Sequence, residues 1–267
     1  MNTIDELLAA LKDARLDVDE RFAAGEGLAE RGDPRLSGEA DELVVIPAGV
    51  LHHKGSVDAE VEERPMESFG IQRHLVTVHA FAAFIDDGGY DDPAWWSPEG
   101  WEWRLDEDAA RPRFWGEEEW APYLVANHPV VGVTAFEAEA YASYRGWRLP
   151  TEDEWERACR GDDARDYPWG NVWDDHACGH REYGPRRTKP IGMFPGGVSP
   201  FGIHDLVGSV WQWTSDARGA EGDYGRARAV RGGAWNNLPW SVGSAGRNAY
   251  PPQAQFSNLG FRCADSM

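Results

Sequence analysis

The residues of this sequence that could bind a transition metal gather in one short segment, Asp174-Asp175-His176-Ala177-Cys178-Gly179-His180. Imidazole and thiolate are the ligands that zinc, copper and iron prefer in proteins. His176 and His180 have a spacing that places two side chains on one face of a helix, but Gly179 argues against a helix here. We therefore expect a polar surface loop, and a transition-metal site is the alternative that these residues leave open.

The composition restricts the kinds of partner that the protein can bind. The chain has 267 residues, with 26 Lys and Arg against 46 Asp and Glu, and a formal net charge of −20 at pH 7. Nucleic acids and anionic membrane surfaces require a basic patch, so we expect neither as the main partner. No apolar run approaches the roughly 20 residues that span a bilayer, and the start lacks the pattern of a secretory signal. We expect no membrane insertion and, by default, a cytoplasmic protein whose localisation is otherwise unknown.

Turn-forming and aromatic residues are unusually frequent, with 30 Gly, 17 Pro and 14 Trp. This composition favours a loop-rich fold in which irregular backbone packs on indole rings. Residues 85–130 contain many aromatic side chains and little periodicity. We interpret them as a long insertion that folds on its own aromatic residues, and a stacking platform for a ligand is the alternative.

Local patterns predict regular structure near the N-terminus. Thr3 and Glu6 form a capping box ahead of a first helix, and a second helix with apolar periodicity follows it. We interpret residues 1–40 as an N-terminal helical extension. Residues 33–42 are polar and contain Pro and Gly, which is typical of a linker, and a β-branched strand follows at 43–46.

Two further capping boxes predict helices in the middle of the chain. One pairs Thr134 with Glu137, and the other pairs Thr151 with Glu154. After Gly161 the sequence consists of short apolar pieces between turns, so little further helix is expected.

Several motifs follow one another in order through the second half of the chain. They are Gly146-Trp147-Arg148-Leu149-Pro150-Thr151-Glu152-Asp153-Glu154-Trp155, Tyr167-Pro168-Trp169-Gly170-Asn171, Phe201-Gly202-Ile203-His204-Asp205-Leu206-Val207-Gly208, Arg231-Gly232-Gly233-Ala234-Trp235-Asn236-Asn237 and Asn258-Leu259-Gly260-Phe261-Arg262-Cys263. Together they resemble the formylglycine-generating enzyme (sulfatase-modifying factor) family, and a weaker match at Ile46-Pro47-Ala48-Gly49 extends the resemblance to roughly residues 43–265. The resemblance implies an α+β fold of the formylglycine-generating-enzyme type, which is C-type-lectin-like and loop-rich, over residues 43–267. Because this fold serves several functions, it does not by itself assign one.

The resemblance also shows which catalytic residues this chain lacks. The family's copper-dependent enzymes use two cysteines, as metal ligand and reactive group, and Ala234 and Pro239 stand at those positions. Iron-dependent sulfoxide synthases of the superfamily carry a three-histidine site on a separate helical domain, whereas the first histidine here is His52. We therefore name no catalytic residue, expect neither copper nor iron, and favour a protein that is not an enzyme.

A structural calcium ion is implied by the resemblance. The family's calcium loop corresponds to Asp205, Gly208, Val210 and Gln212, and carboxylate, amide and carbonyl oxygens are ligands that calcium prefers. Gln212 stands where the family more often has Glu. A plain turn before the next core strand is the alternative.

The family's two structural disulfides are each half present. Cys159 matches one half-cystine, but Ser244 stands at the partner position, and Cys263 matches another, but Ala142 stands opposite it. We interpret both thiols as small buried hydrophobic groups, and a Cys159–Cys263 bridge is the alternative.

Residues 232–262 resemble, in addition, the variable region of diversity-generating retroelement variable proteins, which share this fold. The residues between Gly232-Gly233-Ala234-Trp235-Asn236-Asn237 and Gly260-Phe261-Arg262 have mixed chemistry and no strand or helix period. Loops on a rigid scaffold tolerate such variety, and exposed aromatic residues anchor partners. Arg247, Pro251 and Phe261 are interpreted as framework. The predicted ligand-binding residues are Trp235, Leu238, Trp240, Ser241, Gly243, Ser244, Gly246, Asn248, Ala249, Tyr250 and Phe256.

Three functional hypotheses follow from these patterns. The first is a non-catalytic ligand-binding or display protein, of the retroelement variable type, that recognises a protein or other macromolecular ligand through residues 235–256. The second is a metal- or oxygen-dependent oxidoreductase of the same superfamily, with a partner subunit completing its site. The third is an interaction module whose N-terminal helices dock on a partner.

Overall fold

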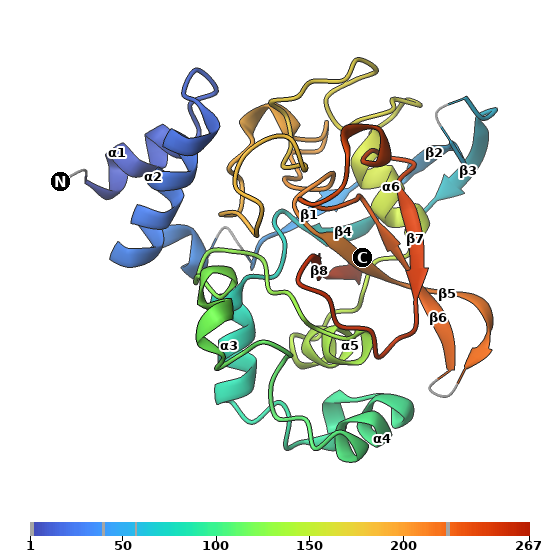
Figure 1. Ribbon diagram of the computed structural model, residues 1–267. Coiled ribbons are helices and arrows are strands. Elements are labelled where there is room, and N and C mark those ends of the chain that lie inside the picture. The colour runs from blue at the N-terminus through green and yellow to red at the C-terminus, as the bar shows by residue number, and fades with distance from the viewer. Residues whose placement is uncertain (1–2, 39–40, 57, 223–224) are drawn as a thin grey trace.

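The computed structural model describes residues 3–38, 41–56, 58–222 and 225–267, with helices and strands mixed along the chain (Figure 1). The α-helices are α1 (Ile4–Leu11), α2 (Val18–Arg31), α3 (Val78–Asp86), α4 (Pro98–Asp106), α5 (Ala135–Tyr144) and α6 (Glu152–Arg160). Short 3-10 helices are η1 (Pro34–Ser37), η3 (Pro93–Trp95), η4 (Glu118–Tyr123), η5 (Pro195–Gly197) and η6 (Pro239–Ser241). The strands are β1 (Leu43–Ile46), β2 (Gly49–His53), β3 (Glu62–Met66), β4 (Phe69–Gln72), β5 (Trp211–Gly222), β6 (Gly225–Arg231), β7 (Arg247–Tyr250), β8 (Leu259–Gly260) and β9 (Ala264–Ser266). The predicted α+β, loop-rich architecture is confirmed.

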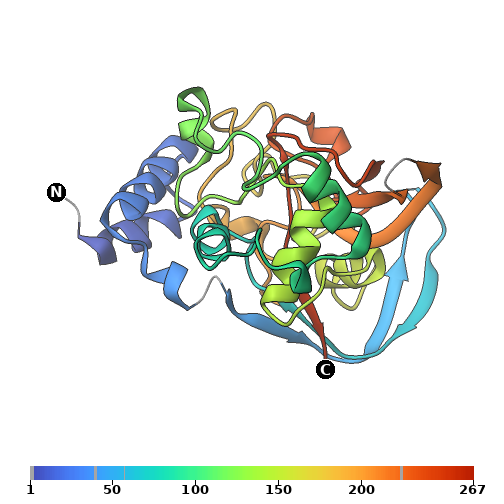
Figure 2. The same ribbon diagram turned by 90° about the horizontal axis from the view of Figure 1, so that it is seen from below.

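The strands form three small sheets. β1, β4 and β9 form one, with β4 antiparallel to both neighbours. β2 and β3 form a hairpin, which Figure 2 shows at the opposite end of the molecule from α1 and α2. The third sheet has the order β7-β6-β5-β8. Residues 232–258, which we call the C-terminal segment, follow the end of β6 and include β7.

The N-terminal helices pack against the rest of the chain. The capping box of Thr3 and Glu6 is present as predicted, and α1 and α2 bury a shared apolar cluster with Met193 and Phe194. Arg21 of α2 donates a hydrogen bond of 2.8 Å from Nη1 to the carbonyl oxygen of Met193. The apolar side of this helix pair is thus covered by the chain's own domain.

The first part of the segment predicted to be a linker is packed. Residues 34–37 form η1, and Arg35 is buried with Asp33 as its ion-pair partner. Arg35 Nη1 also donates to the carbonyl oxygen of Ile191 at 2.5 Å, and Asn127 Nδ2 donates to Asp33 at 2.9 Å. Polarity at 33–35 therefore reflects a buried ion pair, and residues 39–40 of the predicted linker lie outside the described residues.

The core is built on aromatic side chains. Trp155 of α6 and Trp213 of β5 are fully buried, and their indole N–H groups donate to Gln212 and to the carbonyl oxygen of Val133. The predicted helices α5 and α6 begin with the expected capping boxes. The region 85–130 packs on its own indoles, because Trp96 and Trp103 are buried and stack at 6.4 Å. Among the described residues, no helix has both the length and the apolar character needed to cross a bilayer.

Candidate functional site

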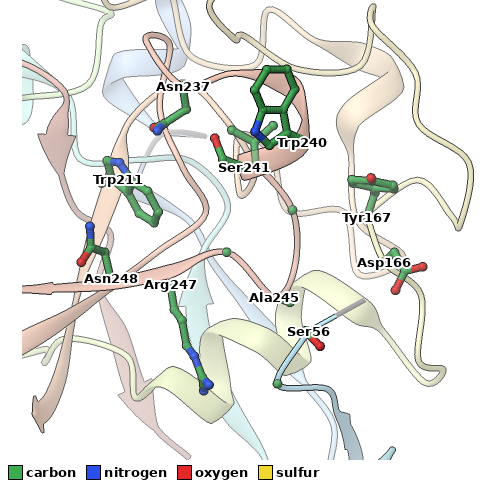
Figure 3. Close-up of a pocket in the computed structure, with 14 residues that line it drawn as sticks. Ser56, Asp166, Tyr167, Trp211, Asn237, Trp240, Ser241, Ala245, Arg247 and Asn248 are labelled. Carbon is green, nitrogen blue, oxygen red and sulfur yellow. The ribbon is translucent and has the colours of Figure 1, made fainter. Parts of the chain in front are cut away.

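A pocket opens between four parts of the chain that are distant in sequence (Figure 3). It has a volume of about 470 Å³. We call it the C-terminal pocket, and the residues that line it are Gly55, Ser56, Asp166, Tyr167, Trp211, Asn237, Trp240, Ser241, Val242, Gly243, Ala245, Gly246, Arg247 and Asn248. Most of its wall is therefore the segment 237–248.

Hydrogen bonds from the end of β6 hold this wall in place. Gly232 has a φ of +95°, and a Cβ there would lie 2.3 Å from the carbonyl oxygen of Leu206, so the turn requires glycine. Its N–H donates to the carbonyl oxygen of Gly246 at 3.1 Å. Arg231 Nη2 donates to the carbonyl oxygen of Ser244 at 2.8 Å. The loop is thus tied at two points to a strand of the central sheet.

Aromatic side chains form two sides of the pocket. Trp240 is 78% exposed, and Figure 3 shows it with Tyr167 on one side, opposite Trp211 and Asn248. The Tyr167 ring stacks on Trp169 with centroids 5.1 Å apart and an interplanar angle of 7°. Burial raises the pKa of Tyr167, which keeps its hydroxyl neutral. The Tyr167 ring and the exposed Trp240 indole thus form one aromatic side of the pocket, and the indole is free to contact a ligand.

Of the two charged residues that line the pocket, Asp166 has an ion-pair partner and Arg247 has none among the described residues. Asp166 forms an ion pair with Lys54, with 2.7 Å between Nζ and Oδ1. Arg247, which is exposed, has no ion pair or hydrogen bond of its guanidinium within the described ranges. An unpaired guanidinium presents several donors in a fixed plane that suits a carboxylate. Arg247 also lines a second cleft, which contains Glu152, Asp153 and Asp216, so its side chain does not belong to the C-terminal pocket alone.

The structure divides the predicted ligand-binding residues into groups. Those that line the C-terminal pocket are Trp240, Ser241, Gly243, Gly246 and Asn248. Tyr250 and Phe256 line a different cavity. Leu238 and Ala249 are half-buried outside both cavities, and Trp235 packs with its ring 6.1 Å from Tyr123 as part of the framework.

The prediction of Ser244 as a ligand-binding residue is wrong, and Gly246 lines the pocket but is not free to vary. Ser244 is fully buried, and its Oγ lies 3.1 Å from Cys159 Sγ, so it belongs to the core. A Cβ on Gly246 would lie 2.9 Å from the carbonyl oxygen of Gly243, so Gly246 is required by the turn. Gly243 is itself buried and offers the pocket only its backbone.

Several pocket residues were not predicted as ligand contacts. Tyr167 begins one of the recognised motifs and Asp166 directly precedes it, but nothing local indicates that this motif meets residues 237–248. Gly55 and Ser56 lie at the tip of the β2–β3 hairpin. Arg247 was assigned to the framework, although its long side chain reaches the pocket surface.

Comparison with known proteins places the chain in a family. Residues 30–267 match the model of the sulfatase-modifying factor enzyme 1-like domain. The chain belongs to this family. A formylglycine-generating enzyme from Bos taurus is 33% identical, over 84% of this chain and 74% of that protein. The hercynine oxygenase of Mycolicibacterium smegmatis is 36% identical over 84% of this chain, which spans 62% of the length of that relative.

Solved structures of family-type domains share the fold. Treponema denticola variable protein 1 superposes with a TM-score of 0.60, 18% identity and coverage of 84% of this chain and 94% of that chain. PvdO from Pseudomonas aeruginosa superposes with a TM-score of 0.61, 22% identity and coverage of 86% and 96%. The resemblance found in the sequence and the C-type-lectin-like fold that it implies are both confirmed.

The thiol groups of this family member are all buried. Ala234, at one of the two reactive cysteine positions of the copper-dependent enzymes, is fully buried, and Pro239, at the other, begins η6. Cys159, Cys178 and Cys263 are buried and unpaired, so the alternative Cys159–Cys263 bridge is wrong. Burial raises the pKa of Cys159 to about 11 and raises that of the other two thiols as well. None of the three thiols supplies a thiolate near neutral pH.

The segment 174–180 is a loop, as Gly179 predicted, but half of it is buried. Residues 177–180 are buried, and His180 Nε2 lies 3.3 Å from the carbonyl oxygen of Asp175. His176 stacks instead on Tyr183 at 5.0 Å. Among the described residues no group of three or more His, Cys, Asp or Glu side chains converges as metal ligands. The prediction of a polar surface loop is therefore wrong for its second half.

The calcium ligands implied by the family do not fit a cation in this chain. The Gln212 side-chain oxygen accepts from Trp155 Nε1 at 2.9 Å and from Arg262 Nε at 2.8 Å, both of which can only donate. Its amide nitrogen donates to the carbonyl oxygens of Asp205 and Leu206 at 3.1 and 2.9 Å. These contacts fix the orientation of the amide. The Gln212 amide nitrogen thus occupies the carbonyl oxygens of Asp205 and Leu206, and the buried Arg262 guanidinium occupies the Gln212 side-chain oxygen. The Gly208 N–H donates to the carbonyl oxygen of Gly232 at 3.1 Å, and Val210 is fully buried.

We therefore expect calcium to leave the stability of the protein unchanged. Thermal unfolding in millimolar calcium chloride and in excess EDTA should give the same midpoint, because nothing in the native state gains a ligand. Magnesium chloride at equal ionic strength is the control for salt. A midpoint that rises only with calcium would show that the loop rearranges around the ion.

Proposed function

We propose that this chain is a non-catalytic ligand-binding protein that recognises a protein or other macromolecular ligand through its C-terminal pocket. The observation that carries the proposal is the combination of an exposed Trp240, a fixed Tyr167 platform and an unpaired Arg247 around one opening. Tryptophan and arginine are enriched in binding hot spots, and Figure 3 shows the two side chains at opposite ends of the pocket. The variable-protein assignment of residues 232–262 remains part of this proposal.

The burial of the thiol groups and the loss of the family's reactive cysteines support binding over catalysis. All three thiols are buried, and the residues at the family's reactive positions are Ala234 and Pro239. The exposed positions Trp240, Ser241 and Asn248 project from a loop that is tied to the end of β6 at Ser244 and Gly246. Such a loop can present different side chains without disturbing the core.

A selection experiment tests this proposal. Random peptides displayed on phage are panned against the full chain, and enriched peptides are measured against Trp240→Ala and Arg247→Gln. We expect Trp240→Ala to weaken binding about 30-fold, as for a central aromatic anchor. Arg111→Gln, at an exposed arginine that lines neither this pocket nor the second cavity beside Phe256, is the matched control and should change little. Peptides that lose no affinity with Trp240→Ala and Arg247→Gln would contradict the proposal.

A second candidate function is an oxygenase, and the 36% identity to a hercynine oxygenase favours it. The chain spans 62% of the length of that relative, so the identity covers part of the relative's sequence. Oxygen uptake by the full chain with hercynine, a thiol and ferrous iron tests this candidate. Uptake that depends on hercynine would support it, and uptake equal to that of a protein-free control would remove it.

A further inference from the structure

A second cavity of about 530 Å³ lies between the 85–130 insertion and the C-terminal segment. The residues that the argument uses are Arg113, Phe114, Asn236, Tyr250, Phe256 and Asn258, all of which line it. We call this cavity the insertion pocket. It shares no lining residue with the C-terminal pocket.

The backbone of the insertion is strained where it forms this pocket. Phe114 has a φ of +78°, a conformation that bulky side chains rarely adopt. Its ring stacks on Trp120 with centroids 4.1 Å apart. The backbone of Arg113 lies close to that of Gly132, where a Cβ would be 2.6 Å from the Arg113 carbonyl oxygen, so this position requires glycine. The Arg113 N–H donates to the Gly132 carbonyl oxygen at 3.1 Å. Strain that is fixed by such contacts is typical of binding sites.

The pocket presents one free positive group. Arg113 is exposed, its guanidinium carbon lies 5.3 Å from the centroid of the Phe114 ring, and no ion pair or hydrogen bond of this guanidinium occurs in the part of the chain that the structure describes. In a chain of net charge −20, an arginine without a carboxylate partner at the edge of a cavity is available for an acidic ligand group.

The pocket also presents a pair of amides and a pair of rings. Asn258 and Asn236 are joined by one hydrogen bond of 2.9 Å, and in either orientation of the two amides one oxygen and one NH₂ group remain free. Tyr250 and Phe256 meet edge to face with centroids 5.0 Å apart, and Phe256 is 42% exposed. An apolar ligand group would gain contact with these rings.

We propose that the insertion pocket binds the C-terminal aromatic residue of a peptide chain. The carboxylate pairs with the Arg113 guanidinium, the last peptide group exchanges hydrogen bonds with Asn236 and Asn258, and the aromatic side chain packs on Tyr250 and Phe256. The three kinds of group in the pocket thus match the three parts of such a terminus. An internal aromatic residue would leave Arg113 unpaired.

Fluorine NMR on the full chain tests this assignment with four probes. They are N-acetyl-4-fluorophenylalanine, the tripeptide acetyl-Gly-Gly-4-fluorophenylalanine, and the C-terminal amide of each. We expect both acids to bind, the tripeptide at least as tightly as the amino acid, and both amides to bind about tenfold more weakly. Arg113→Gln should abolish the difference between acid and amide, whereas Phe256→Ala should weaken acids and amides equally. Arg111→Gln is the matched control and should change nothing.

Other outcomes would overturn the proposal. Equal binding of acids and amides, no binding of any probe, or an unchanged preference in Arg113→Gln would each do so. Binding of the N-acetyl amino acid without the tripeptide would assign the pocket to a free acyl amino acid instead. Trp240→Ala alters only the C-terminal pocket, so we expect it to leave this binding intact, and a loss in that variant would place the probes in the other site.

Discussion

Replacing Arg231 by Met is expected to lower the free energy of unfolding by about 3 kcal/mol, the lower end of the usual cost of breaking a buried ion pair, because Glu156 keeps Arg160 as its second partner. Arg231 is 1% exposed, and its Nη2 lies 2.7 Å from Oε2 of the fully buried Glu156. Burial favours a higher pKa for Glu156, but Arg231 and Arg160 outweigh it and hold the pKa below its usual value. Chemical denaturation at pH 7 measures the loss.

Arg218 provides the matched control for this variant. It forms an ion pair with Glu152, as Arg231 also does, but its side chain is 46% exposed. Arg218→Met should therefore lower the free energy of unfolding by less than about 1 kcal/mol. Equal losses in the two variants would mean that burial does not decide the effect. Because Arg231 also holds the Ser244 carbonyl oxygen, its replacement should weaken ligand binding at the C-terminal pocket as well.

Lys189 is expected to destabilise the fold near neutral pH. It is 1% exposed, and burial lowers its pKa from 10.5 to about 7. Between these two values the unfolded chain binds more protons at this group than the folded chain, so its contribution to the free energy of unfolding rises with pH. Lys189→Met removes this penalty, and we expect the variant to be more stable than the parent by on the order of 3 kcal/mol at pH 7.

The pH dependence separates this effect from simple packing. The advantage of Lys189→Met should shrink as the pH rises from 7 towards 10.5, because the parent then loses less by burying a neutral amine. Denaturation midpoints of both proteins across this range give the difference. Lys12→Met, at an exposed lysine, should show no such trend. An advantage that stays constant with pH would assign the effect to shape alone.

The parts of the fold that the sequence predicted are those decided by neighbouring residues. The capping boxes at Thr3, Thr134 and Thr151 each join two residues that are three positions apart. The sequence spacing therefore predicts the hydrogen bonds directly. The overall fold was predicted from the family resemblance of the ordered motifs. The linker prediction is wrong for residues 33–37, because Arg35 there donates to the carbonyl oxygen of Ile191, which is distant in sequence.

The candidate site could be predicted only in part for the same reason. Trp240 and Asn248 were found because they lie in a segment of mixed chemistry, but their meeting with Tyr167 and the hairpin tip depends on the folded chain. The direction in which the Gln212 amide points depends on Trp155 and Arg262, which no local pattern reveals. Residues 237–248 line one cavity and residues 250–258 contribute to another, because the 85–130 insertion packs beside the second group.

Hydrogen–deuterium exchange of the full chain with and without an enriched peptide tests the central claim most directly. We predict slower exchange in residues 237–248 and at residues 166–167, because ligand contact there should restrain the backbone that forms the C-terminal pocket. Unchanged exchange in both segments, with slowing confined to α2 or to another face, would contradict the account.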